Sequence, residues 1–212
     1  MGPSRIMLLR HAEKPGTYQG SKYAGVNALG AADDESLVTL GWQRAGGIAE
    51  LFTGAQGLPT RAGLALPDFL YAANPADHHD NEPSQRPYQT IAALAAKLGR
   101  PVNCDFRKND YPALVSALLA LALPNATSCS VLVAWQHQDI LPKSSGADCI
   151  LKELLQQTGT DPAQLPDLPS GPWPEDRYDM VLVLERPTGS GPFTAFRQVP
   201  QLLLAGDSRQ PL

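Results

Sequence analysis

The sequence is short of cysteine, histidine and positive charge, and each shortage excludes a class of protein. Its three cysteines, Cys104, Cys129 and Cys149, form neither a C-x-x-C pair nor a zinc-ligand spacing with any of the four histidines. We expect them to be reduced thiols in or near the core. The 17 basic and 21 acidic side chains give a net charge of −4, whereas nucleic-acid-binding domains carry a basic excess. The composition therefore argues against a zinc-stapled fold and against nucleic acid as a partner.

Long apolar runs and nucleotide-binding loops are missing as well. The first apolar run ends at Arg10 and is too short for a signal-peptide core, and no stretch approaches the roughly 18 apolar residues of a membrane span. Neither G-x-x-x-x-G-K-[ST] nor G-x-G-x-x-G occurs. We expect no membrane partner and no cofactor, with the cytoplasm as the default location, and we leave the oligomeric state open.

What the sequence does contain is a series of short apolar runs that alternate with helical patterns. This alternation favours helices packed on both faces of a largely parallel sheet. We predict a single domain over residues 1–212, built as a three-layer α/β/α sandwich with a mostly parallel central sheet. The predicted strands are 6–9, 69–73, 101–105 and 129–135, followed by a terminal hairpin of 180–184 and 193–199. The predicted helices are 42–52, 85–98, 112–121 and 146–157.

Punctuation residues mark the ends of these elements. Thr39 and Ser84 are expected N-caps, and Gly99 and Gly159 are expected to end their helices. Long loops at about 15–38 and 74–83 should lie on the substrate side, since loops of this length inside compact domains are often functional. The proline-rich stretch 162–174 is the longest expected irregular connection, and partner docking is an open alternative for it.

Reactive side chains follow two of the predicted strands. Arg10 and His11 end the first strand, and His137 follows the strand with the strongest apolar run. Ligands of open α/β sheets bind at the carboxyl ends of the strands. Arg86 lies in the first turn of its helix, where free N–H groups and an arginine fork suit phosphate oxygens. Together these residues predict a pocket for a tetrahedral dianion.

Such a set could carry out phosphoryl transfer. A neutral imidazole is a competent nucleophile, and the arginines would stabilise the charge of the transition state. The leaving alkoxide would still need a proton from a nearby carboxylic acid. No step requires a metal.

Four segments in order resemble a known family. They are Leu8-Leu9-Arg10-His11-Ala12-Glu13-Lys14-Pro15, Leu40-Gly41-Trp42-Gln43-Arg44-Ala45, Ser84-Gln85-Arg86-Pro87-Tyr88-Gln89-Thr90 and Val131-Leu132-Val133-Ala134-Trp135-Gln136-His137. The set is similar to the signature of the histidine phosphatase (phosphoglycerate mutase-like) superfamily and spans residues 6–137. Ala12 stands where the family usually has glycine, and Gln138 stands where one branch has its catalytic aspartate.

The resemblance implies a role for each matching residue. His11 would be the phosphorylated nucleophile, Arg10 and Arg86 would hold the phosphate, and His137 would contact it and stabilise charge. The other branch of the family carries its proton donor after the third strand, where this chain offers Asp110 and, as a rival, Asp105.

Glu13, Lys14 and Ser84 are the expected substrate-binding residues, and the alternative for Glu13 and Lys14 is a pair that fixes the loop of Arg10 and His11. We therefore expect a metal-independent phosphatase that acts on a phosphomonoester or phosphoprotein through a phosphohistidine. The alternative is a phosphate- or phosphopeptide-binding module with little or no turnover. The cluster Asp77-His78-His79-Asp80 reads as a solvated loop more readily than as a metal site.

Overall fold

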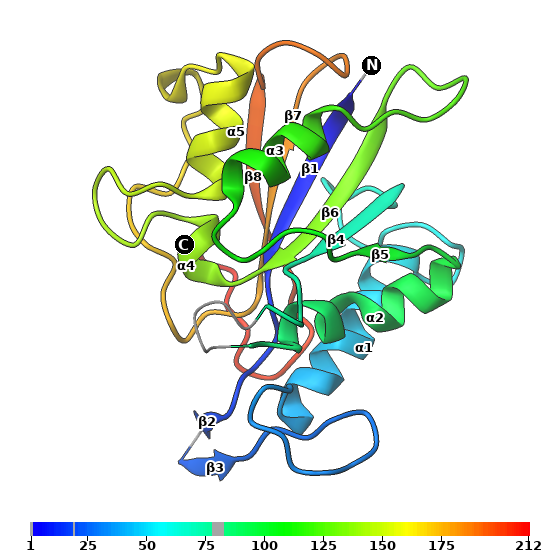
Figure 1. Cartoon of the computed structure of the whole chain (residues 1–212), viewed down its shortest axis with the longest axis vertical. Helices are drawn as coiled ribbons and strands as arrows, with labels where there is room; N and C mark the ends of the chain where they lie inside the picture. The colour runs from blue at the N-terminus through cyan, green and yellow to red at the C-terminus, as the bar shows by residue number, and fades with distance from the viewer. Residues whose placement is uncertain (1, 19, 78–82) are drawn as a thin grey trace.

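The computed structural model describes residues 2–18, 20–77 and 83–212, and its centre is one six-stranded sheet (Figure 1). Across the sheet, the order is β5 (Val102–Asn103), β4 (Phe69–Ala72), β6 (Cys129–Trp135), β1 (Pro3–Arg10), β7 (Met180–Glu185) and β8 (Ala195–Pro200). The pairs β5–β4, β4–β6 and β6–β1 are parallel, and the pairs β1–β7 and β7–β8 are antiparallel. Only β7 therefore runs against the others, which confirms the mostly parallel sheet and the terminal hairpin.

Helices cover both faces of the sheet, as Figure 1 shows. On one face, α1 (Thr39–Thr53) and α2 (Arg86–Leu98) pack on Met7 and Leu9 of β1. On the other face, α3 (Tyr111–Leu119) and α5 (Ile150–Thr158) pack on Ile6 and Leu8. Successive residues of a strand point to opposite faces, so a strand covered on both sides needs a continuous apolar run. The predicted three-layer α/β/α sandwich is confirmed.

The loop after β1 contains a short hairpin that the sequence pattern did not predict. Its strands, β2 (Gly16–Tyr18) and β3 (Ser21–Tyr23), pair antiparallel and form a second, separate sheet. Three-residue strands are too short to show an alternating pattern. The first half of the predicted loop 15–38 is thus partly ordered as a β-ribbon.

Both predicted N-caps are wrong. Val38, one residue before Thr39, is the N-cap of α1, and its backbone N–H is held by the carbonyl oxygen of Glu13 at 3.1 Å. Gln85 occupies the N-cap of α2 in a helical conformation, so Ser84 lies one residue too early to cap it. Gly99 and Gly159 do end their helices in the left-handed conformation, with φ of 62° and 65°.

Several element boundaries differ from those predicted, among them those of α5, β5 and α3. The helix expected from residue 146 begins at Ile150, because Cys149 is extended and its Sγ accepts a hydrogen bond from the Lys152 N–H. The predicted strand 101–105 forms only two ladder residues, and α3 ends at Leu119. A four-residue helix, α4 (His137–Ile140), follows β6 directly, and a 3-10 turn covers Pro162–Gln164. Cys129 and Cys149 are buried free thiols, and Cys104 is half-buried.

Candidate active site

The ends of β1 and β6 place the two predicted site histidines at one edge of the sheet. Arg10 is in register with Trp135, and the backbone N–H of His11 donates to the carbonyl oxygen of Trp135 at 2.8 Å. His137 follows two residues later as the first residue of α4. Because the strands are parallel neighbours, residues 126 positions apart in the sequence come to the same edge, as predicted.

The ring of His11 is buried and held in one orientation. Its Nδ1 lies 2.7 Å from the carbonyl oxygen of Ala12. A carbonyl only accepts, so Nδ1 carries the proton and Nε2 keeps an unprotonated lone pair. Burial lowers the pKa of His11 well below its usual value, and the charges of Arg10 and Arg86 lower it further. The side chain is therefore a neutral imidazole at pH 7.

Arg10 is fully buried and faces no carboxylate in its hydrogen bonds. Its Nη1 donates to the carbonyl oxygens of Pro174, Glu175 and Arg177, at 3.1, 2.7 and 2.8 Å. Its Cζ lies 3.8 Å from the centroid of the Tyr178 ring. Burial lowers the pKa of Arg10, but an arginine guanidinium stays charged in proteins.

Arg86 begins α2 and is coupled to the loop that carries His11. Its Nη1 donates to the carbonyl oxygen of Asp34 at 2.9 Å. The hydroxyl of Thr90 donates to the carbonyl of Arg86 at 2.7 Å and accepts the N–H of Ala12 at 2.8 Å. One threonine thus fixes the distance between the helix start and the residue after His11. The side chain of the N-cap residue Gln85 makes no capping bond, and no acidic residue lies in the first turn of α2.

His137 is nearly buried, and its Nδ1 has no hydrogen-bond partner among the described residues. Burial lowers its pKa to about 3, with further contributions from the charges of Arg10 and Lys14. At pH 7 it is therefore a neutral imidazole. The charge of Lys143 also lowers the pKa of His137. The Nζ of Lys143 lies 3.8 Å from Oδ1 of Asp139, two residues after His137.

A concentration of buried, unpaired polar atoms marks this edge of the sheet. Within the described residues, the buried atoms without a hydrogen-bond partner include Arg10 Nε and Nη2, Arg86 Nε, His137 Nδ1 and Ser84 Oγ. Buried polar atoms are nearly always hydrogen-bonded, and each orphan calls for a ligand, a water or an ion. Two arginines supply most of these atoms, so the geometry suits an oxyanion.

Glu13 and Lys14 follow His11 by two and three residues, and they make different contacts. Both carboxylate oxygens of Glu13 accept from Arg44, the shortest contact being 2.8 Å, and Arg44 also reaches Asp207 at 2.7 Å. Burial lowers the pKa of Arg44, but hydrogen bonds to Asp207 and Glu13 outweigh it and raise the pKa overall. Lys14 is half-buried, and its carbonyl oxygen accepts the hydroxyl of Tyr18 at 2.6 Å. The Glu13–Arg44–Asp207 cluster holds the loop beneath the site.

The glycine of the second motif has a packing role. A Cβ on Gly41 would lie 2.6 Å from the carbonyl oxygen of Glu13 and 3.0 Å from its nitrogen. The start of α1 therefore packs directly on the backbone that follows His11, which only glycine permits.

The two predicted proton donors lie on exposed positions. Asp105 accepts a 2.6 Å hydrogen bond from Asn103, and its charge raises the pKa of Cys104 and Tyr71 after the effect of burial. Asp110 is the N-cap residue of α3 without a side-chain capping bond. The loop between them does reach the site edge, since the carbonyl of Lys108 accepts the indole N–H of Trp135 at 2.8 Å.

The sequence pattern missed one buried carboxyl and two tyrosines. Asp139 accepts hydrogen bonds from the Tyr111 hydroxyl at 2.6 Å and from Gln136, and burial raises its pKa. Tyr178 stacks on Arg10, and its hydroxyl lies 3.2 Å from that of Tyr18. The spacing of Asp139, two residues after His137, was a usable signal. No local sequence signal identifies Tyr178, because its contact with Arg10 joins residues 168 positions apart.

The metal interpretation of residues 77–80 finds no support in the part of the chain that is described. His78, His79 and Asp80 lie outside it, and no group of three or more His, Cys, Asp or Glu within it is placed to hold a metal ion. Likewise, no described helix is long and apolar enough to cross a bilayer.

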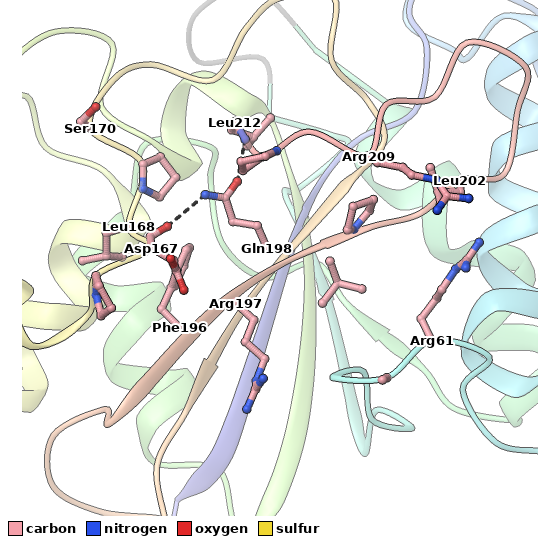
Figure 2. Close-up of a pocket in the computed structure, with 16 residues that line it drawn as sticks. Arg61, Asp167, Leu168, Ser170, Phe196, Arg197, Gln198, Leu202, Arg209 and Leu212 are labelled. Atoms are coloured by element: carbon pink, nitrogen blue, oxygen red, sulfur yellow. Dashed lines mark hydrogen bonds between the residues drawn. The ribbon is translucent and has the colours of Figure 1, made fainter.

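A groove of about 880 Å³ lies along β8, and none of the predicted site residues lines it (Figure 2). Gln198 joins its two walls, donating to the Asp167 carbonyl at 3.0 Å and accepting from the Leu212 N–H at 2.7 Å. Arg61 and Arg209 lie at one end in Figure 2. The cavity is thus separate from the Arg10–His11 edge.

No protein-family model matches the chain, and no curated protein does. Solved structures do align with it. The SixA protein of Agrobacterium tumefaciens is 18% identical with a TM-score of 0.43, over 93% of this chain and 96% of that one. A phosphoserine phosphatase of Entamoeba histolytica in complex with 3-phosphoglyceric acid is 14% identical with a TM-score of 0.44, over 93% and 98%. A mycobacterial glucosyl-3-phosphoglycerate phosphatase with VO3 is 13% identical with a TM-score of 0.43, over 92% and 97%. The likeness is one of fold, and the scores lie too low to bear on activity.

Proposed function

We propose that the chain is a phosphatase of the histidine phosphatase superfamily, hydrolysing a phosphomonoester or phosphoprotein through a phosphohistidine on His11. The observation that carries the proposal is the set of unpaired donors around a neutral, buried imidazole. Arg10 contributes two buried nitrogens, and Arg86 and His137 contribute one each. Phosphate is the anion whose several oxygens can accept all of them.

The residues would bind the phosphoryl group before they act on it. The Nε and Nη2 atoms of Arg10 form one edge of a planar fork that suits two oxygens. The Nε of Arg86 and the uncapped start of α2 would take a third. Lys14 and the hydroxyl of Ser84 are further proposed substrate contacts, whereas Glu13 would act on the site through its pairing with Arg44.

The proposed reaction has two steps. The lone pair on Nε2 of His11 attacks phosphorus as the bond to the leaving oxygen breaks. The proton stays on Nδ1, which donates it in a hydrogen bond to the Ala12 carbonyl. The leaving oxygen takes a proton from a carboxylic acid, for which we propose Asp110, with Asp105 as the rival. Water then gives a proton to the carboxylate left by the first step and attacks phosphorus as the phosphorus–nitrogen bond breaks, so that the acid is restored, Nε2 regains its lone pair and inorganic phosphate leaves. The arginines stabilise the equatorial charge in both steps, and no metal is used.

Replacing the nucleophile tests the proposal. His11→Asn and His11→Ala should abolish hydrolysis of an aryl phosphate, with both variants folded by circular dichroism. Wild-type protein mixed with ³²P-labelled substrate and then denatured should carry label that survives alkali and is lost in acid, as a phosphorus–nitrogen bond would be. Unchanged turnover in His11→Asn would refute the phosphohistidine mechanism.

A second candidate is a phosphate- or phosphopeptide-binding module with little turnover. It is favoured by the exposure of Asp105 and Asp110 and by the hydrogen bond that already occupies Asp105. An aryl phosphate needs little protonation of its leaving group, so it separates the two functions. Binding of phosphate or vanadate without hydrolysis of either an aryl or an alkyl phosphate would support the module.

A further inference from the structure

The segment 173–178 surrounds the guanidinium of Arg10, and we call it the Arg10-holding loop. Three of its carbonyl oxygens, from Pro174, Glu175 and Arg177, accept from the single nitrogen Nη1 at 2.7–3.1 Å. The ring of Tyr178 covers the face of the same group at 3.8 Å. One loop therefore fixes both an edge and a face of the guanidinium plane.

Fixing an edge and a face leaves a single orientation. The carbonyls prevent the group from sliding, and the ring prevents it from turning about its long axis. The edge made of Nε and Nη2 is then the part of the group that is buried and has no hydrogen-bond partner among the described residues. That edge is the one that we propose meets the phosphoryl oxygens.

The loop is itself anchored in the fold. The indole N–H of Trp173, a buried core residue, donates to the carbonyl oxygen of Arg177 at 2.8 Å, the same oxygen that Arg10 uses. The Arg177 side chain pairs with Asp179 at 2.7 Å. The Tyr178 hydroxyl meets the Tyr18 hydroxyl at 3.2 Å, and Tyr18 donates to Lys14.

The choice of partners distinguishes Arg10 from Arg44, a buried arginine of α1. Arg44 is neutralised by the carboxylates of Glu13 and Asp207. Among the described residues, the direct contacts of the Arg10 guanidinium are with carbonyl dipoles and a π face, which stabilise a cation without cancelling its charge. A carboxylate in their place would repel an incoming dianion. The holding loop thus keeps a desolvated positive charge available.

We propose that Tyr178 is a positioning residue for Arg10: its ring and the three carbonyls of the Arg10-holding loop fix the guanidinium so that the Nε–Nη2 edge faces a bound phosphoryl group. The inference rests on the proposed function for the identity of the anion. It assigns a role to a residue outside the four sequence motifs.

The test compares three variants by calorimetric binding of inorganic phosphate and of vanadate. Tyr178→Leu removes the ring and should weaken phosphate binding about tenfold. Tyr178→Phe keeps the ring and should bind within about twofold of the wild type. Phe193→Leu is the matched control, because the Phe193 ring lies 5.2 Å from Arg186, whose Nε and Nη1 also donate to carbonyls. No buried nitrogen of Arg186 lacks a partner within the described residues, so this variant should lose stability but keep its phosphate affinity.

The outcomes separate positioning from simple destabilisation. Equal phosphate affinity of Tyr178→Leu and the wild type would overturn the proposal, as would equal weakening in Phe193→Leu. If Tyr178→Leu does not fold, a Tyr178→Phe variant that binds phosphate as weakly as Arg10→Ala would overturn it too. Because the measurement is binding, a protein that holds phosphate but never hydrolyses an ester would refute the phosphatase and leave this comparison intact.

Discussion

The backbone N–H of His11 donates a 2.8 Å hydrogen bond to the carbonyl oxygen of Trp135. This bond extends the β1–β6 ladder one residue beyond the last residue of β1, so the sheet itself sets the separation of His11 from the chain that leads to His137. The other side of the site is set by Thr90, which joins the residue after His11 to the first residue of α2. A site fixed on rigid elements is preorganised for its ligand.

Thr90→Val should therefore impair both stability and catalysis. The change keeps the shape but removes the acceptor of the buried Ala12 N–H, which should cost about 1–3 kcal/mol in the free energy of unfolding. We expect kcat/KM for an aryl phosphate to fall about tenfold. Urea titration and steady-state kinetics measure the two effects.

Thr53→Val is the matched control for that variant. Thr53 is also a buried helix threonine, and its hydroxyl donates to the Ala49 carbonyl at 2.7 Å. Within the described part of the chain no N–H donates to this hydroxyl, and Thr53 lies in the last turn of α1. Its kinetics should match the wild type. A Thr90→Val enzyme with wild-type kinetics would show that the bridge does not position Arg86.

Glu13→Ala should destabilise the protein far more than removal of an exposed ion pair. Arg44 is buried between two carboxylates, and removing one partner of a buried pair typically costs 3–5 kcal/mol. Because Asp207 remains, we expect about 2–4 kcal/mol from urea titration. Glu50→Ala, which breaks the exposed contact with Lys97 at 2.6 Å, should cost under about 1 kcal/mol. Similar losses in the two variants would contradict a supporting role for the Glu13–Arg44–Asp207 cluster.

The strands that carry the site could be predicted because their signal is local. A strand buried on both faces must be apolar throughout, so β1 and β6 can be recognised from their apolar runs. The carboxyl ends of these strands then locate Arg10, His11 and His137. The capping role of Ser84 failed for a local reason too, since α2 begins at Arg86 and Gln85, in a helical conformation, occupies the N-cap position instead.

Other parts of the site depend on distant pairings that no window of sequence contains. Asp207 reaches Arg44 across 163 positions, and Tyr178 reaches Arg10 across 168. Each lies outside the apolar runs, in segments rich in glycine and proline. Tyr178 lies just before β7 and Asp207 lies after β8. Their roles become visible only when these two segments fold back onto Arg10 and Arg44.

The buried histidines predict a loss of stability in acid. His137 has a pKa of about 3 in the folded protein and near 6.5 when unfolded. Below pH 6.5 the unfolded chain takes up a proton that the folded protein refuses, so the free energy of unfolding falls as the pH drops from 6.5 toward 3. His11 adds to the effect in the same direction.

His137→Asn isolates that contribution. Urea titrations at pH 7.5, 6.5, 5.5 and 4.5 should show a shallower decline for the variant than for the wild type, because asparagine does not titrate. Saturating phosphate should reduce the decline in the wild type, since a bound anion favours protonated imidazoles. Parallel curves for the two proteins would mean that His137 titrates normally in the folded state.

The last prediction concerns the proton that the leaving group needs. If Asp110 donates it, Asp110→Asn should slow hydrolysis of an alkyl phosphate about a hundredfold or more, because an alkoxide is a poor leaving group. The same variant should hydrolyse an aryl phosphate within about threefold of the wild type, since a phenolate leaves unprotonated.

Asp105→Asn is the matched control on the same loop and should change neither rate. A hundredfold alkyl-specific loss in Asp105→Asn instead would transfer the role to Asp105. Wild-type rates on the alkyl ester in both variants would exclude both carboxyls as the proton donor. That result would point to the buried Asp139, because burial raises its pKa and so favours the protonated form that a donor requires.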